Sequence, residues 1–126
     1  MPELPELEVV RDVLTRRLGG RVIGGVSVEP KGGPIVVRDL TGEGFREGLE
    51  GAVVEGVTRR GKFLLFQFDR APLTLAVNPR LTGRFQLCEP GAKKAGPLHV
   101  TFHFYHPPIE LRYVDQKKMG QLYLTR

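Results

Sequence analysis

The chain has only one cysteine, Cys88, among its 126 residues. A single thiol cannot form an internal disulfide, and it cannot supply a zinc site that is built only from cysteines. No apolar run approaches the roughly 18 residues that a membrane-spanning helix needs. The sequence also has no internal repeat and no linker long enough to divide it. We therefore expect one domain, without membrane association, in the reducing cytoplasm.

The composition that remains is that of an ordinary globular domain with an uneven charge. Hydrophobic residues make up 40% of the chain and charged residues 26%, with a formal net charge of +5. Residues 1–56 carry seven Lys/Arg and ten Asp/Glu, whereas residues 57–126 carry twelve and four. So basic a second half is typical of a surface that binds nucleic acid, although a solvated basic surface has the same composition.

The first 20 residues predict one helix. Pro5 suits a first helical turn, where its missing N–H removes no hydrogen bond, and Gly19 and Gly20 end the segment. Apolar residues recur at helical spacing through this segment, at Leu4, Leu7, Val10, Leu14 and Leu18. This spacing gives the helix an apolar stripe that can pack on a core.

The rest of the chain predicts about eight short strands separated by turn clusters. The segments are 21–28, 51–58, 62–68, 73–77, 84–88, 99–105, 109–114 and 121–124. Residues 39–49 have helix-like spacing, but their glycines allow a short helix at most. We expect a mainly β member of the α+β class: an antiparallel β-sandwich with an N-terminal helix and at most one further short helix.

The three histidines, His99, His103 and His106, are the candidates for metal ligands. His99 and His103 fall in a predicted strand, where their even spacing puts them on one side, about 13 Å apart. That distance is too long for one ion. We therefore expect no metal site.

The N-terminus has a specific chemical possibility. Removal of Met1 before a small residue is usual, and it would leave Pro2 with a free secondary amine. An α-amine titrates near pH 8, so a useful fraction is nucleophilic at neutral pH. Glu3 and Glu6 place carboxylates close enough for acid–base chemistry. The alternative is that Pro2 and Glu3 only lead into the helix.

Four segments resemble one enzyme family, in the same order along the chain. PELPELE (2–8) resembles the PELPEVE signature of the formamidopyrimidine-DNA glycosylase/endonuclease VIII family, which acts in base-excision repair. RRGKFLLF (59–66) resembles that family's RRGKYLLF, and NPRLTGRF (78–85) lies where the family has a segment of the type HLGMSG. LRYVDQKKMG (111–120) resembles LRYxDPRRFG. The resemblance spans nearly the whole chain.

The resemblance implies a β-sandwich with the N-terminal helix alongside, and a bifunctional DNA glycosylase/AP lyase activity. Pro2 would attack C1′ of the damaged nucleotide, expel the oxidised base and form a Schiff base. Glu3 would be the general acid that helps to open the sugar, and Glu6 a supporting carboxylate. Elimination of the flanking phosphates would then cleave the strand.

The resemblance also implies DNA-contacting residues, some of which depart from the family pattern. Leu81 stands where the family has a wedge methionine, and Lys117 and Met119 where it has an arginine and a phenylalanine. Lysine keeps the charge but lacks the planar fork of arginine. Asn78 replaces a phosphate-binding histidine, and Lys62 would bind a phosphate at the lesion. The implied set is Lys62, Asn78, Arg80, Leu81, Lys117, Lys118 and Met119. The alternatives are that Lys62 is an ordinary exposed strand lysine and that Leu81 and Met119 are core residues.

The family continues beyond this region into a helix–two-turn–helix domain and usually a four-cysteine zinc finger. Nothing in this sequence corresponds to either, so we interpret residues 1–126 as the N-terminal catalytic domain. The zinc would belong to the missing part, and we expect no cofactor in this chain. The expected partner is damaged double-stranded DNA, bound by a monomer. Without the second wall of the DNA cleft, affinity and turnover should be poor.

Two other functions fit parts of the sequence. Tautomerase-like enzymes also use an N-terminal proline and are similarly small, but they begin with a strand, whereas this chain begins with a predicted helix. A basic β-sandwich that binds nucleic acid without catalysis fits the charge distribution. The presence or absence of a covalent adduct with abasic DNA separates this reading from the catalytic one.

Overall fold

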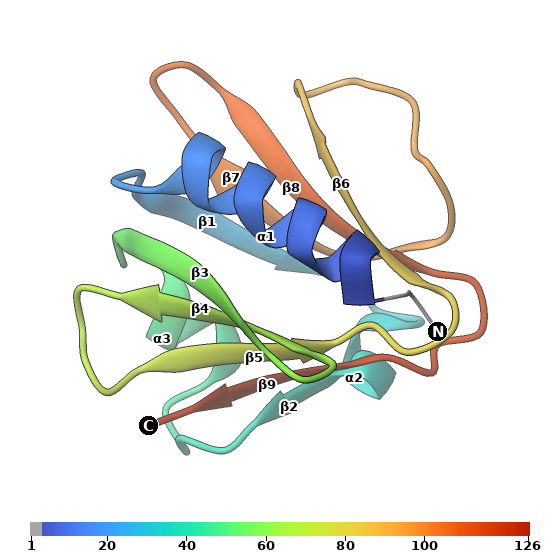
Figure 1. Cartoon of the computed structure of the whole chain (residues 1–126), viewed down its shortest axis with the longest axis horizontal. Coiled ribbons are helices and arrows are strands. Elements are labelled where there is room, and N and C mark those ends of the chain that lie inside the picture. The colour runs from blue at the N-terminus through green and yellow to red at the C-terminus, as the bar shows by residue number, and fades with distance from the viewer. Residues whose placement is uncertain (1–3) are drawn as a thin grey trace.

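Helix α1 (Leu4–Leu18) packs against strand β3 (Val54–Arg60) at the side of a two-sheet sandwich (Figure 1). The computed structural model describes residues 4–126. The predicted apolar stripe faces the core, with Leu7, Leu14 and Leu18 buried. The Thr15 hydroxyl donates a hydrogen bond to the backbone oxygen of Val57 at 2.8 Å, which fixes the helix along the strand. The predicted N-terminal helix is confirmed.

The first sheet has four antiparallel strands. Its order is β1 (Ile23–Val28), β7 (Leu98–Phe104), β8 (Ile109–Asp115) and β6 (Gly83–Cys88). Apolar residues alternate along β7, so Val100, Phe102 and Phe104 all point into the core. All of these strands were predicted from their alternating apolar residues.

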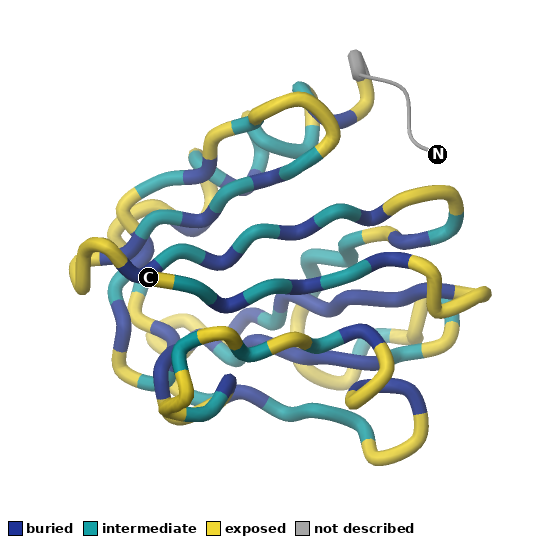
Figure 2. Tube along the Cα trace, turned by 90° about the horizontal axis from the view of Figure 1, so that it is seen from below, coloured by how far each residue is buried: buried dark blue, intermediate teal, exposed yellow. Residues whose placement is uncertain are grey.

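The second sheet has five strands, and its inner face closes the core. Its order is β2 (Val37–Asp39), β9 (Gln121–Thr125), β5 (Thr74–Asn78), β4 (Phe63–Phe68) and β3. Buried and less buried positions alternate along its strands (Figure 2). The rings of Phe66, Phe85 and Tyr113 meet edge to face, with centroids 5.8 and 5.6 Å apart, and join the two sheets.

The structure differs from the sequence prediction in the segment between β1 and β3. Helix α2 (Gly33–Val36) forms where a turn cluster was expected, with Pro34 in its first turn. Strand β2 follows it directly and pairs parallel with β9, so the sandwich is not wholly antiparallel. Helix α3 (Phe45–Leu49) lies within the stretch expected to hold at most a short helix. A three-residue strand has too few alternating positions to be recognised from sequence. The mainly β sandwich with an N-terminal helix is confirmed.

The ends of several elements meet at one end of the sandwich. The β3–β4 turn, the β5–β6 loop, the β8–β9 loop and the start of α1 all lie on the right in Figure 1. No helix within residues 4–126 is long and apolar enough to cross a membrane. The meeting of these loops determines where a functional site can form.

Candidate functional site

Three loops bring five of the predicted DNA-contacting residues together. Lys62 lies in the β3–β4 turn, Asn78 ends β5, Arg80 and Leu81 follow in the β5–β6 loop, and Met119 lies in the β8–β9 loop. These five residues line one open depression of about 430 Å³. Residues separated by up to 57 positions in the sequence therefore form one surface, which we call the loop depression.

The two apolar residues of the loop depression are exposed. Leu81 is 49% exposed and Met119 is 39% exposed. The alternative that they are core residues is therefore wrong. Apolar side chains held in water beside a lysine and an arginine can insert between bases while the cations bind phosphates.

Lys117 and Lys118 are exposed on the same β8–β9 loop but do not line the loop depression. Lys118 faces a neighbouring depression that Lys31 and Glu29 also line. The backbone N–H of Lys117 donates to the Thr82 hydroxyl oxygen at 3.2 Å, which ties this loop to the β5–β6 loop. Both lysines thus extend the positive surface around the loop depression.

Asp115, which the sequence did not single out, joins the two loops. Its carboxylate is fully buried at the end of β8. It accepts hydrogen bonds from the Tyr113 hydroxyl at 2.8 Å, from the Gly120 backbone N–H at 2.8 Å and from the Thr82 hydroxyl. Burial alone would raise the pKa of Asp115, but these hydrogen bonds outweigh it and lower the pKa below its usual value. We call this arrangement the Asp115 latch.

Two positions require glycine, Gly83 at the start of β6 and Gly120 in the β8–β9 loop, because the Tyr113 hydroxyl occupies the space beside them. A Cβ atom on Gly120 would lie 1.8 Å from this oxygen. One on Gly83 would lie 2.3 Å from it and 2.5 Å from the backbone oxygen of Pro79. Burial, together with the hydrogen bond to the Asp115 carboxylate, raises the pKa of Tyr113 and keeps its donor proton in place. In the sequence, only the two glycines could have indicated this close approach of Tyr113.

Two of the three histidines, His99 and His103, have separate structural contacts. His99 Nε2 donates to the backbone oxygen of Asp115 at 2.8 Å, because a carbonyl can only accept. His103 is hydrogen-bonded to the Ser27 hydroxyl at 2.9 Å. Within the described part of the chain, no three His, Cys, Asp or Glu side chains are placed to hold a metal ion.

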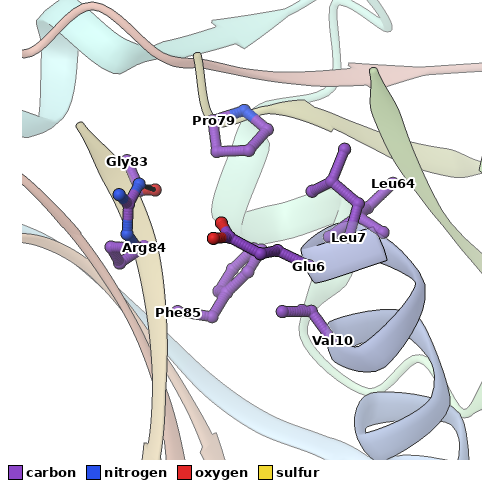
Figure 3. A pocket seen from close by; sticks show the side chains of 8 residues that line it. All are labelled: Glu6, Leu7, Val10, Leu64, Pro79, Gly83, Arg84 and Phe85. Atoms are coloured by element: carbon purple, nitrogen blue, oxygen red, sulfur yellow. Dashed lines mark hydrogen bonds between the residues drawn. The ribbon is translucent and has the colours of Figure 1, made fainter. Parts of the chain in front are cut away.

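Glu6 projects from the first turn of α1 into a small cavity of about 80 Å³ (Figure 3). Its carboxylate points into the space between Pro79, Arg84 and Phe85. The other walls are apolar or backbone: Leu7, Val10, Leu64 and Gly83. Because Pro79 lies between Asn78 and Arg80, this cavity adjoins the loop depression through the β5–β6 loop. Pro2 and Glu3 lie outside the described residues.

Comparisons with known proteins match nearly the whole length of this chain. Residues 1–122 match the family model described as the formamidopyrimidine-DNA glycosylase N-terminal domain. The formamidopyrimidine-DNA glycosylase of Symbiobacterium thermophilum is 40% identical over 124 residues, covering 98% of this chain and 39% of that protein. That of Cytobacillus firmus is 37% identical, covering 98% of this chain and 43% of that protein. The chain thus spans less than half the length of these curated relatives.

Solved structures have the same fold with DNA bound. A complex of the Lactococcus lactis Fpg protein with DNA containing an abasic site has a TM-score of 0.84 at 31% identity. A complex of the same protein with DNA containing an oxidised pyrimidine has a TM-score of 0.84 at 32% identity. Each match covers 98% of this chain and 44% of the solved chain. The chain therefore belongs to the formamidopyrimidine-DNA glycosylase family, in which it matches the N-terminal domain.

Proposed function

We propose that this chain is the catalytic N-terminal domain of a bifunctional DNA glycosylase/AP lyase that removes oxidised bases in base-excision repair. The observation that carries the proposal is the loop depression. Exposed apolar and cationic side chains lie there beside the Glu6 cavity, at the end of the fold where α1 begins. We further propose that the chain acts on damaged double-stranded DNA as a monomer, in the cytoplasm.

The proposed reaction begins at the Pro2 nitrogen once Met1 has been removed. Its lone pair forms a bond to C1′ of the damaged nucleotide. The base departs with the electrons of the glycosidic bond and takes up the proton that the proline nitrogen loses. Glu3 then protonates the sugar ring oxygen as the C1′–O4′ bond breaks, which leaves an iminium ion between Pro2 and C1′. The negative charge of Glu6 would stabilise this cation.

Strand cleavage follows from the electron-accepting iminium. Loss of a proton from C2′ sends the electrons of that C–H bond toward the iminium and gives an enamine. The enamine electrons then expel the 3′ phosphate, and a second elimination expels the 5′ phosphate. Every step uses the amine and carboxylates of the chain. We therefore propose that the chemistry of this domain needs no cofactor.

We propose that the residues of the loop depression contact the DNA at the lesion. Leu81 and Met119 would fill the gap left in the stack when the damaged nucleotide is extruded. Lys62 and Arg80 would hold the adjacent backbone or bases, with Lys117 and Lys118 adding long-range attraction.

Borohydride trapping tests the proposed function. The Met1-free chain is mixed with a duplex that contains a natural abasic site, and sodium borohydride is added. Reduction of the iminium should leave a stable covalent adduct between the protein and the abasic strand. A duplex with a tetrahydrofuran analogue is the control, because it lacks the C1′ hydroxyl and cannot form an imine. Binding to the tetrahydrofuran duplex without any adduct from the abasic one would support the non-catalytic binding module instead.

Lys62→Ala should weaken DNA binding in a salt-dependent way. Removing one phosphate contact is expected to reduce the slope of log K against log salt concentration by about one unit. The slope is measured by titrating a tetrahydrofuran duplex at several salt concentrations. Arg16→Ala removes an exposed cation at the far end of α1 and serves as the matched control. An unchanged slope for Lys62→Ala would remove Lys62 from the phosphate-binding surface.

A further inference from the structure

A polar cluster lies on the outer face of the first sheet, where β1, β7 and β8 run side by side. His103 is the partly exposed residue between two buried phenylalanines of β7, so its side chain faces outward. It lies directly opposite Glu110 of β8. On its other side it pairs with Gly25 of β1, which leaves Ser27 diagonally beside the imidazole. We call Ser27, His103 and Glu110 the Ser27 cluster; none of them lines the loop depression or the Glu6 cavity.

The three side chains of the Ser27 cluster are connected in a fixed order. The Ser27 hydroxyl oxygen lies 2.9 Å from His103 Nε2, and the Glu110 carboxylate lies 3.5 Å from His103 Nδ1. A carboxylate can only accept, so it favours the neutral imidazole that carries its hydrogen on Nδ1. Nε2 then keeps its lone pair, and the Ser27 hydroxyl donates to it. This is the order of nucleophile, base and carboxylate in which a histidine can remove the proton of a serine.

Arg112 holds the Glu110 carboxylate in place. Arg112 is buried, and its Nε donates to one carboxylate oxygen of Glu110 at 3.0 Å. Its Nη1 donates to the backbone oxygen of Ala92 at 2.8 Å, which fixes the guanidinium itself. The other oxygen of the carboxylate is the one that faces His103. Glu110 can therefore orient the imidazole and stabilise the imidazolium that forms when Ser27 loses its proton.

Tyr105 provides a surface beside the cluster on which a substrate can lie. Its side chain is 54% exposed, and its ring lies against Gly24, where a Cβ atom would be 2.2 Å from a ring carbon. A Cβ atom on Gly25 would lie 3.7 Å from both the Tyr105 hydroxyl oxygen and His103 Cδ2, so both groups lie over this glycine. Within residues 4–126, Tyr105 enters side-chain hydrogen bonds only through its backbone oxygen, which accepts from Arg21. Its hydroxyl is therefore available to an oxygen of a substrate.

An open depression adjoins the cluster through Tyr105. It has a volume of about 400 Å³, and Tyr105 and Gly24 form part of its wall. The exposed Val22, which also lines it, adds apolar surface. A depression with an aromatic ring and an aliphatic side chain in its wall can hold a small aryl or acyl group.

We propose that Ser27 is the nucleophile of a second reactive site, which accepts acyl groups from activated esters such as aryl esters. The Ser27 oxygen forms a bond to the carbonyl carbon while its proton moves to His103 Nε2. The Tyr105 hydroxyl donates to the carbonyl oxygen as this oxygen becomes negative. Collapse of the intermediate re-forms the C=O bond and expels the phenol oxygen, which takes the proton from His103. Both steps then run again with water as the nucleophile and the Ser27 oxygen as the leaving group, which releases the carboxylic acid.

Diisopropyl fluorophosphate tests the nucleophile, because it reacts with activated serines and not with ordinary hydroxyls. The Ser27 oxygen would displace fluoride from phosphorus while His103 takes the proton. Ser27 is the only serine of the chain, so a labelled serine in a peptide digest identifies the site. The wild-type chain should be labelled once, on Ser27, and S27A should remain unlabelled.

Three variants test the roles of the neighbouring groups, with the Tm of each measured alongside. H103Q should slow labelling by about a hundredfold, because an amide keeps a polar group beside Ser27 but cannot take up its proton. Y105F should hydrolyse 4-nitrophenyl acetate about tenfold more slowly than the wild type, at an unchanged Tm. H106N is the matched control. It removes an exposed imidazole from the adjacent turn, and asparagine tolerates the positive φ there, so labelling should not change.

Three outcomes would overturn the inference. The first is a wild-type chain that stays unlabelled on Ser27 under conditions that fully label a serine esterase. The second is equal labelling rates for the wild type and H103Q, which would show that His103 does not activate Ser27. If H103Q lowers the Tm, the ester reaction of Y105F decides instead, and a hydrolysis rate equal to that of the wild type is the third. Because the site uses neither Pro2 nor DNA, borohydride trapping leaves these results unaffected.

Discussion

A chain that keeps Met1 is expected to form no borohydride-trapped adduct with abasic DNA. The Met1–Pro2 peptide bond converts the proline nitrogen from a secondary amine to a tertiary amide. Its lone pair is then delocalised into the carbonyl, so it neither accepts a proton near neutral pH nor attacks C1′. The loss should be complete and not graded, because the reaction needs that one lone pair.

The comparison needs two forms of one chain, identified by intact mass before trapping. The Met1-free form should give the adduct, and the form that retains Met1 should give none. Both forms should bind the tetrahydrofuran duplex with similar affinity, because the loop depression is the same in each. An adduct from the Met1-retaining form would place the nucleophile on another amine. Lys62→Ala in that form would then show whether the exposed lysine of the loop depression is responsible.

Much of the fold could be predicted because its long elements have strong periodicity. The helix stripe at Leu7, Leu14 and Leu18 and the alternation in β4 correspond to the buried positions. The segment between β1 and β3 was harder to predict. The apolar run Ile35–Val37 is divided between the end of α2 and the start of β2, and so short a run has no distinct period. The parallel pairing of β2 with β9 depends on tertiary packing, which a local pattern does not show.

The candidate site was predicted as separate motifs and not as a connected structure. The resemblance identified Lys62, Asn78, Arg80, Leu81 and Met119, and the structure places them around one depression. It could not indicate that Thr82 and Asp115, 33 positions apart, are joined by a buried hydrogen bond. Such a contact depends on the pairing of β6 with β8, which puts Gly83 opposite Asp115. Local patterns do not encode it.

Asp115→Asn is expected to lower the free energy of unfolding by about 3 kcal/mol at pH 7, because it breaks the Asp115 latch. The carboxylate accepts from three donors, on Thr82, Tyr113 and Gly120. An amide of the same shape turns one acceptor into a donor, so at least one buried donor then faces another donor. The measurement is urea unfolding of both chains, with the exposed Asp12→Asn as the control, which should change stability little.

The pH dependence of the unfolding free energy tests whether the charge of Asp115 causes this loss of stability. Its pKa in the folded chain is lower than in the unfolded chain, where it is about 3.9. Its contribution to stability is therefore present above that value and is lost as the pH falls through the lower, folded pKa. The stability gap between wild type and Asp115→Asn should be full at pH 7 and shrink in acid. A gap of constant size down to pH 3 would show that the carboxylate charge is not its source.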